Sequence, residues 1–268
     1  MSTPASSSVV LADRPAPHVL RLLINRPDKR NSIDFDVRQA LLDALRAARI
    51  DGTTRAVVFG GVGGMFSAGG DLATMSGLTE DQARARMQHI HILCRLVGGL
   101  GLPVVSVVEG AGAGAAIGLA LLGDHIVMGE GARILFPFLK LGLTPDWGQL
   151  LTLPRRVGLP AARRILCAGK PVGAAEALRI GLVDTVVPDA QAMETAVAEA
   201  ASLAQQPLEA FARMKQRLNR ISTSLDEELI REENDQAVCL LTDEFNEGFD
   251  AFKNKRNPDF TQLAGAKR

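Results

Sequence analysis

Apolar residues along most of this chain follow two alternating patterns. Over residues 35–50 they recur at the spacing of one helical face, and residues 84–96 are expected to form a second helix. Around these helices lie short apolar runs typical of buried strands, at 18–25, 56–59, 103–108 and 124–128. Strands that alternate with helices at this spacing predict an α/β fold with parallel strand pairing.

The pattern changes after about residue 205. Between Pro207 and Phe252 the sequence is rich in helix-forming and charged residues and has almost no β-branched runs, so helices are expected over 208–218 and 224–241. The first eight residues are small and polar, without the charged and apolar regions of a signal peptide. The expected division is therefore a disordered leader at 1–8, a core at 9–204 and a C-terminal helical oligomerisation region at 205–268.

Composition restricts the setting and the partners. Of 268 residues 47% are hydrophobic, which is ample for a large core, and Lys plus Arg balance Asp plus Glu at 30 each. No overall field therefore favours nucleic acid or an anionic membrane. The longest apolar stretches are too short to span a bilayer, and three widely separated cysteines fit a reducing compartment. We expect a cytoplasmic protein that binds neither nucleic acid nor membrane.

Two runs of small residues give the strongest chemical signal: FSAGGDL from Phe66 to Leu72, and EGAGAGAA from Glu109 to Ala116. Each is placed where a strand should pass into a helix, and the second is expected to open a helix that ends near Leu122. Without bulky side chains, a ligand can approach the backbone N–H groups closely. At a helix start these groups have no internal partner. Two such donors that converge on one oxygen form an oxyanion hole for a thioester carbonyl.

In their order and spacing, these runs and several further segments resemble the crotonase (enoyl-CoA hydratase/isomerase) superfamily over nearly the whole chain. The further segments are NRPDKRN at 25–31, LGLTPD at 141–146, LPRRVG at 153–158, AAEA at 174–177, GLV at 181–183 and FKNKR at 252–256. The resemblance implies a crotonase-like ββα spiral with a C-terminal helical trimerisation region, assembled as homotrimers or hexamers. It also implies an acyl-CoA thioester substrate, with coenzyme A arriving as part of that substrate and no metal or redox cofactor.

The resemblance also assigns roles to individual positions. The N–H groups of Ala68 and Ala115 would be the oxyanion donors. The substrate-binding positions would be Lys29, Arg30, Phe66, Gly69, Gly70, Asp71, Leu72, Gly114, Phe138, Trp147 and Lys255. The loop around Lys29 and residues 69–71 would line the CoA channel, and Lys255 would reach a CoA phosphate, often in a neighbouring subunit. Ordinary surface charge is the alternative for the three cationic residues, and a plain tight turn is the alternative for the two alanines.

The two glutamates that position and activate water in hydratases of the family are absent. One should lie three residues after the second donor, where this chain has Gly118, and the other is replaced by Phe138. Neither residue can transfer a proton, and hydration needs a general base and a general acid within reach of the water. A standard hydratase mechanism is therefore not expected.

One carboxylate remains near the expected site, Asp146 in the segment TPDWG. Dienoyl-CoA isomerases of the family, and those that shift double bonds in ring-opened phenylacetyl-CoA products, carry an aspartate at the matching position. A single carboxylate suffices to move a proton along an enoyl thioester. An apolar site with Phe138 and Trp147 nearby would raise the pKa of that carboxyl and exclude water. An enoyl-CoA isomerase with Asp146 as its proton shuttle is therefore the expected function.

Several alternatives remain open for the same residue. Asp146 and Gln149 have the spacing of a capping box, so the aspartate would then only cap a helix. In 4-chlorobenzoyl-CoA dehalogenases of the superfamily the matching aspartate is a nucleophile that works beside a histidine, and His91 falls at the place of that histidine. A non-catalytic acyl-CoA-binding protein and a hydratase with non-standard residues are the remaining alternatives.

Overall fold

The computed structural model describes residues 8–263. Most of the expected leader therefore lies outside the described residues, as do the last five residues of the expected C-terminal region. The strands are β1 (Val10–Ala16), β2 (Val19–Ile24), β3 (Ala56–Gly61), β4 (Val104–Val108), β5 (Ala111–Ala113), β6 (His125–Gly129), β7 (Arg133–Leu135), β8 (Val172–Gly173) and β9 (Thr185–Val187). The α-helices are α1 (Phe35–Ile50), α2 (Glu80–Gly98), α3 (Ala115–Ala120), α4 (Gln149–Val157), α5 (Leu159–Ala168), α6 (Ala174–Arg179), α7 (Ala192–Leu203), α8 (Leu208–Asn219), α9 (Leu225–Cys239) and α10 (Asp243–Lys253). Four short 3-10 helices are η1 (Pro27–Lys29), η2 (Leu72–Thr74), η3 (Phe138–Leu141) and η4 (Asp189–Gln191).

The strands form a six-stranded sheet in the order β1-β2-β3-β4-β6-β9 and a three-stranded sheet in the order β5-β7-β8. From β2 to β9 the neighbours in the large sheet are parallel, as expected, and β1 is an antiparallel edge strand. The sequence analysis did not predict β1. Most of its residues are exposed and it contains Pro15, so it lacks the apolar alternation by which a strand is found.

Consecutive ββα units build the core as a spiral. In β4-β5-α3 and in β6-β7-α4, the first strand joins the large sheet and the second joins the small one. The second run of small residues, at 109–116, differs from expectation, because its first half forms β5. The helix starts only at Ala115, and it ends at Ala120 rather than near Leu122. This two-sheet spiral confirms the expected fold class.

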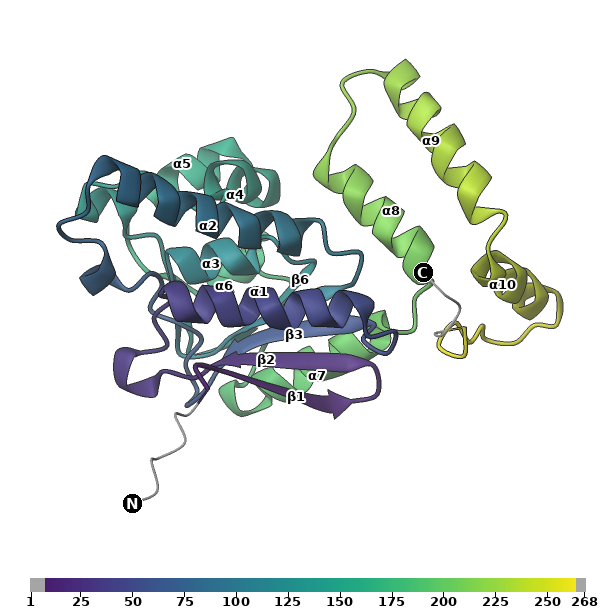
Figure 1. The fold of residues 1–268 in the computed structure, drawn as a ribbon, viewed down its shortest axis with the longest axis horizontal. Coiled ribbons are helices and arrows are strands. Elements are labelled where there is room, and N and C mark those ends of the chain that lie inside the picture. The colour runs from purple at the N-terminus through teal and green to yellow at the C-terminus, as the bar shows by residue number, and fades with distance from the viewer. Residues whose placement is uncertain (1–7, 264–268) are drawn as a thin grey trace.

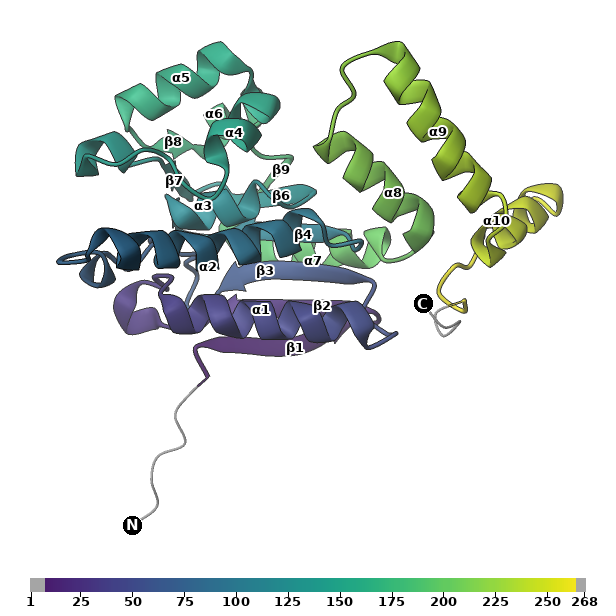
Figure 2. The same ribbon diagram turned by 45° about the horizontal axis from the view of Figure 1, so that its top comes forward.

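Helices cover both faces of the large sheet (Figures 1 and 2). On one face the apolar residues of α1 and α2 pack with Leu20, Leu22 and Phe59 into the main core. On the other face α7 contributes an alanine stripe that packs against the valines of β3, β4 and β6. The stripe consists of Ala192, Ala196, Ala200 and Ala204, all buried. Because alanine is small, α7 can lie close against the strands and seal this face of the sheet.

Helices α8, α9 and α10 extend away from the core in both views (Figures 1 and 2). The connection between α7 and α8 contains the expected boundary at residues 204 and 205, and the division into a core and an oligomerisation region stays a prediction. A buried ion pair attaches α8 to the core: Lys215 Nζ lies 2.6 Å from Asp124 Oδ2 and donates to Leu102 O at 3.0 Å. At the start of α8, the Glu244 carboxylate accepts hydrogen bonds from the N–H groups of Leu208 and Glu209 at 2.7 and 3.0 Å.

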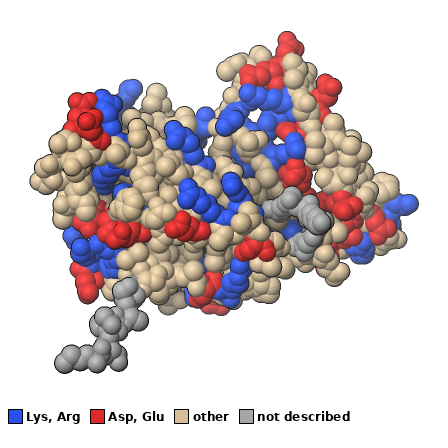
Figure 3. Space-filling view, in the orientation of Figure 1, with Lys and Arg blue, Asp and Glu red and all other residues tan. Residues whose placement is uncertain are grey.

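Acidic and basic side chains are interspersed over the face shown in Figure 3. This distribution agrees with the balanced composition, and this face carries no broad area of one sign. Within residues 8–263, no helix is both long enough and apolar enough to cross a bilayer.

Candidate active site

The two runs of small residues lie side by side. Ser67 and Gly112 form a parallel bridge, in which Ser67 N–H donates to Ala111 O at 3.1 Å and Ala113 N–H donates to Ser67 O at 3.0 Å. Gly69 follows with φ +92°, and a Cβ at Gly69 would lie 2.5 Å from Ala113 O and 3.4 Å from Ala115 N. Only glycine fits this close approach. The structure thus brings the first run to the start of α3.

The N–H groups of the two predicted oxyanion donors differ in their hydrogen bonding. Ala115 N–H is in the first turn of α3, where a helical N–H group has no carbonyl partner within its own helix. Ala68 N–H already donates to Arg30 O at 2.9 Å. The carbonyl of Arg30 is held by a loop in which Arg30 and Asn31 are both left-handed, with φ of 51° and 54°. A ligand oxygen that uses Ala68 N–H must therefore displace the Arg30 carbonyl.

Trp147 occupies the space next to Gly118, where hydratases of the resembled family carry a glutamate. A Cβ at Gly118 would lie 2.4 Å from Trp147 Cβ and 3.0 Å from Gln149 Nε2. Trp147 is buried, and its φ of 54° is left-handed, which costs a residue other than glycine about 1–2 kcal/mol. Packing against α3 holds the tryptophan in this conformation. The chain thus lacks the glutamate and also has no room for any side chain at this position.

Phe138, at the position of the second missing glutamate, lies beside the second run. Its side chain is buried, and its Cζ atom would lie 3.6 Å from a Cβ placed on Gly114. Gly114 immediately precedes Ala115, so the ring forms an apolar wall next to one predicted donor. The role of Phe138 in shaping the acyl site stays a prediction.

Asp146 does not cap a helix, so the capping hypothesis is wrong. Helix α4 begins at Gln149, its N-cap residue is Gly148, and no side chain caps it. The side-chain bond runs the other way, because Gln149 Nε2 donates to the backbone carbonyl of Asp146 at 3.0 Å. Asp146 Oδ1 is buried and has no hydrogen-bond partner among the described residues. A buried carboxylate oxygen without a donor is unfavourable for folding, which is typical of a group reserved for a ligand.

Burial raises the pKa of Asp146 from 3.8 to about 6. The Arg86 guanidinium and the backbone N–H of Asp146 itself oppose this rise and do not cancel it. Cys94, on α2, is close enough to feel the Asp146 charge. Burial first, and then Asp146, raises the pKa of this thiol to about 12. The thiol therefore stays neutral, and Asp146 is the group here whose charge changes near neutral pH.

Arg86 is a site residue that the sequence analysis missed. It lies on α2, four residues before Ile90 and eight before Cys94, so the three residues share one helix face. Arg86 Nη2 would lie 3.5 Å from a Cβ placed on Gly70, and its charge acts on Asp146. The signal in the sequence was its spacing, because Arg86 is a cation that shares a helix face with the apolar residues of α2.

His91 does not face the site. It is exposed, whereas Ile90 next to it is fully buried and Arg86 and Cys94 are both partly buried. His89 is also occupied elsewhere, because its ring nitrogens contact Arg38 Nε at 3.1 Å and Gln39 Oε1 at 3.2 Å. The structure therefore places no histidine of α2 beside Asp146, and the dehalogenase alternative lacks its second residue.

The predicted CoA-channel residues divide into exposed cations and one structural acid. Lys29 and Arg30 are exposed, and Lys29 Nζ is 3.8 Å from Asp71 Oδ2. Asp71 is itself buried. It pairs with Arg26 at 3.2 Å and accepts a hydrogen bond from Ala73 N–H at the start of η2. These bonds give Asp71 a role in holding the loop rather than in contacting a substrate.

The remaining predicted binding residues are spread out. Phe66 is fully buried in the core, whereas Leu72 is exposed at the start of η2. Lys255 follows α10, and that helix stands apart from the core in Figures 1 and 2. Within one chain, therefore, Lys255 does not join the residues gathered around Ala68 and Ala115.

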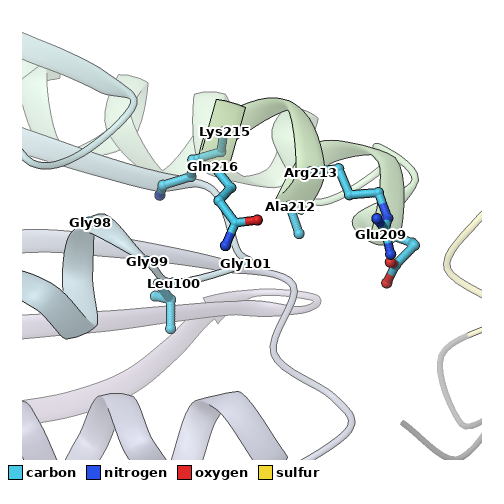
Figure 4. A pocket seen from close by; sticks show the side chains of 9 residues that line it. All are labelled: Gly98, Gly99, Leu100, Gly101, Glu209, Ala212, Arg213, Lys215 and Gln216. Atoms are coloured by element: carbon cyan, nitrogen blue, oxygen red, sulfur yellow. The ribbon is translucent and has the colours of Figure 1, made fainter. Parts of the chain in front are cut away.

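A separate pocket lies between the end of α2 and helix α8 (Figure 4). It has a volume of about 200 Å³. Its lining residues are Gly98, Gly99, Leu100, Gly101, Glu209, Ala212, Arg213, Lys215 and Gln216. None of the predicted site residues is among them.

Known proteins resemble this chain over nearly its whole described length. The family model described as enoyl-CoA hydratase/isomerase matches residues 16–263. A 1,2-epoxyphenylacetyl-CoA isomerase of Escherichia coli is 33% identical over 248 residues, which cover 91% of this chain and 95% of the relative. A probable enoyl-CoA hydratase of Rhodobacter capsulatus is 34% identical, over 90% of this chain and 93% of the relative. The crystal structure of an enoyl-CoA hydratase from Bacillus anthracis superposes with a TM-score of 0.88 at 29% identity, covering 94% of this chain and 99% of that one.

Proposed function

This chain belongs to the enoyl-CoA hydratase/isomerase family, and we propose that within this family it acts as an isomerase that shifts a carbon–carbon double bond in an enoyl-CoA thioester. Asp146 is its proton-transfer group. The observation that carries the proposal is the Asp146 carboxyl, which has a buried oxygen without a partner in the described part of the chain and a pKa raised to about 6.

The reaction proceeds through a dienolate. The ionised Asp146 removes a proton from the α or γ carbon of the thioester, and the electron pair of that C–H bond moves through the conjugated system to the carbonyl oxygen. The N–H of Ala115 stabilises the oxyanion, joined by Ala68 N–H once the thioester oxygen replaces the Arg30 carbonyl. The protonated Asp146 then returns the proton at the other carbon, which moves the double bond and regenerates the carboxylate.

The same residues argue against hydration. Adding water requires a base for the water and an acid for the carbon. Hydratases of the family carry a glutamate at each of the two positions that supply these groups, and this chain has Gly118 and Phe138 there. Phe138 instead supplies apolar surface beside Gly114, next to one predicted donor, and Trp147 does so beside Gly118. One similar protein is named an isomerase and another a probable hydratase, so similarity alone does not separate the two reactions.

The substrate carries the only cofactor that this chemistry needs, which is coenzyme A. Lys29 and Arg30, both exposed and cationic, are the proposed contacts for its phosphates. Residues 8–263 contain no group of three or more His, Cys, Asp or Glu side chains arranged to hold a metal ion.

The deciding experiment is turnover of 3-enoyl-, 2-enoyl- and 2,5-dienoyl-CoA thioesters by the purified protein in D₂O. We expect interconversion of 3-enoyl and 2-enoyl isomers, with deuterium incorporated at the α or γ carbon and no 3-hydroxyacyl-CoA. Hydration of 2-enoyl-CoA would contradict the proposal in favour of a hydratase with non-standard residues. Tight binding of all three without turnover or deuterium exchange would favour a non-catalytic acyl-CoA-binding protein.

The pH dependence should follow the ionisation of Asp146. Because the base must be ionised, kcat/KM should rise about tenfold per pH unit at low pH and level off above a pKa of about 6. The profile is obtained from initial isomerisation rates with buffers of constant ionic strength. If kcat/KM does not rise between about pH 4.5 and 7, Asp146 is not the base.

We also propose that the chain assembles as a trimer or hexamer through its C-terminal helices. Apolar side chains are exposed along α9 and α10, among them Leu225, Ile230, Phe249 and Phe252. Phe252 is 84% exposed, and Leu241, between the two helices, is 87% exposed. Several large apolar side chains exposed along two helices are typical of an interface.

Removing residues 245–268 should then yield monomers, as measured by sedimentation equilibrium. Replacing Phe245, Phe249 and Phe252 by serine should have the same effect without shortening the chain. Ile50→Ser is the matched control, because Ile50 is 81% exposed but lies at the end of α1, outside the C-terminal helices. A truncated protein with the oligomeric mass of the full chain would refute this interface.

A further inference from the structure

Arg86 has a partly buried cationic side chain that the proposed proton transfer does not use. Its Nε atom is buried and has no hydrogen-bond partner among the described residues. Its Nη2 atom lies against Gly70, within the first run of small residues. A guanidinium in such a place forms few bonds with water, so its N–H groups favour an acceptor that a ligand brings.

The charges around Arg86 are unbalanced. Arg38, which is 3% exposed, is close enough for the two guanidinium charges to repel each other. Asp34 also acts on Arg38, but its carboxylate is already paired with Arg26 at 2.9 Å. Arg86 itself acts on Asp146, which must release and take up its charge during the reaction. Of these two acids, one is therefore already paired with Arg26 and the other does not keep a fixed charge.

Asp146 defines which part of a ligand would meet Arg86. If Asp146 is the base, the carbons next to the thioester lie beside it. Arg86 lies against Gly70, two residues after the predicted donor Ala68, so its guanidinium is near the reacting end of the substrate rather than at the nucleotide end of CoA. A planar guanidinium binds a carboxylate through two parallel hydrogen bonds, which no aliphatic chain can provide.

We propose that Arg86 determines specificity by binding a second carboxylate, carried by the acyl group of the substrate, so that the preferred thioesters are those of dicarboxylic acids. This proposal rests on the proposed function only for the position of the acyl chain. Binding of a saturated thioester tests it without any turnover.

The experiment compares three pairs of saturated thioesters that differ only in the terminal carboxylate: butyryl- and succinyl-CoA, hexanoyl- and adipoyl-CoA, and octanoyl- and suberoyl-CoA. Dissociation constants are measured by calorimetry at pH 7.5. In at least one pair, wild-type protein should bind the dicarboxylic thioester about ten- to a hundredfold more tightly, the range expected for a charge-assisted hydrogen-bonded pair. Arg86→Met should abolish the preference and leave the affinity for the monocarboxylic partner unchanged.

Two further variants separate this role from a structural one. Arg84→Met is the matched control, because Arg84 lies on the same helix but is exposed and bonded to Glu80 at 2.9 Å. It should keep the preference of the wild type. Arg86→Lys should restore part of it, because lysine keeps the charge but not the paired geometry.

Two outcomes would overturn the proposal. One is equal affinity of the wild type within all three pairs. The other is an Arg86→Met protein that is folded, as judged by circular dichroism, and whose affinity for both members of a pair is lowered by the same factor. That result would assign the charge of Arg86 to CoA phosphate binding. A protein that prefers dicarboxylic thioesters but isomerises none would refute the proposed function and leave the role of Arg86 intact.

Discussion

Replacing Asp146 with asparagine should lower kcat for double-bond isomerisation by about a thousandfold, with little change in the affinity for a saturated acyl-CoA. General acid–base catalysis by a positioned side chain contributes about 10²- to 10⁴-fold. Asparagine has nearly the same shape and cannot transfer a proton. Asp71, the acid of the first run, is already paired with Arg26. Turnover that survives the substitution would assign the chemistry to another residue.

The same substitution should make the folded protein more stable at pH 7.5. Burial raises the pKa of Asp146 from 3.8 to about 6, so ionisation of this group opposes folding as pH rises through that interval. A rise of about 2 units corresponds to about 3 kcal/mol at neutral pH, and the asparagine variant should recover about 1–3 kcal/mol of this. Below about pH 4 the gain should vanish. Urea unfolding at both pH values measures it, and a loss of stability would indicate a structural role for the carboxylate.

Placing a side chain at Gly118 should destabilise the fold by several kcal/mol. Even alanine would put its Cβ 2.4 Å from Trp147 Cβ, and both α3 and Trp147 are buried. Overpacking of a core costs about 1–3 kcal/mol and occasionally more. Gly118→Glu should cost more than Gly118→Ala, because a buried carboxylate also loses its hydration. It should not create hydratase activity, although it restores a family residue.

Gly98→Ala is the matched control for these variants. Gly98 also lies in a helix, at the end of α2, but a Cβ there would make only an ordinary contact of 3.8 Å with Leu122. This alanine should leave stability unchanged or raise it by up to about 1 kcal/mol. Free energies of unfolding from urea titration provide the comparison. Equal stability of Gly118→Ala and wild type would show that the segment around Trp147 can move aside.

Elements with a complete local signal were predictable from the sequence. The bounds of α1 agree with the structure because its apolar period is continuous and Asp34 caps it through Val37 N–H. The short strands β5, β7 and β8 were missed, since two or three residues carry no periodicity and their pairing is fixed by tertiary contacts.

At the site, the sequence indicated which residue types were present but not their surroundings. The resemblance located Asp146. Only the structure distinguishes a helix cap from a carboxylate with one buried oxygen that has no partner within residues 8–263, because the two differ in backbone path and not in composition. Arg86 was overlooked because its contact with Gly70 joins two different segments and leaves no local signal in the sequence. The bond from Ala68 N–H to Arg30 O depends on two left-handed residues, and neither is a glycine that would have marked the turn.

The contact between Trp147 and Gly118 limits the order in which such a site can arise. A side chain at position 118 and the present path of the chain at 146–149 exclude one another, because the clash involves a Cβ atom that every residue except glycine has. A descendant of a protein with glutamate at position 118 must first lose that side chain, and with it the second acid–base group, before the segment can take this path. Return to hydration would then require moving Trp147 before the glutamate could be regained. Both changes therefore pass through a protein that has neither the glutamate at position 118 nor Trp147 in its present position.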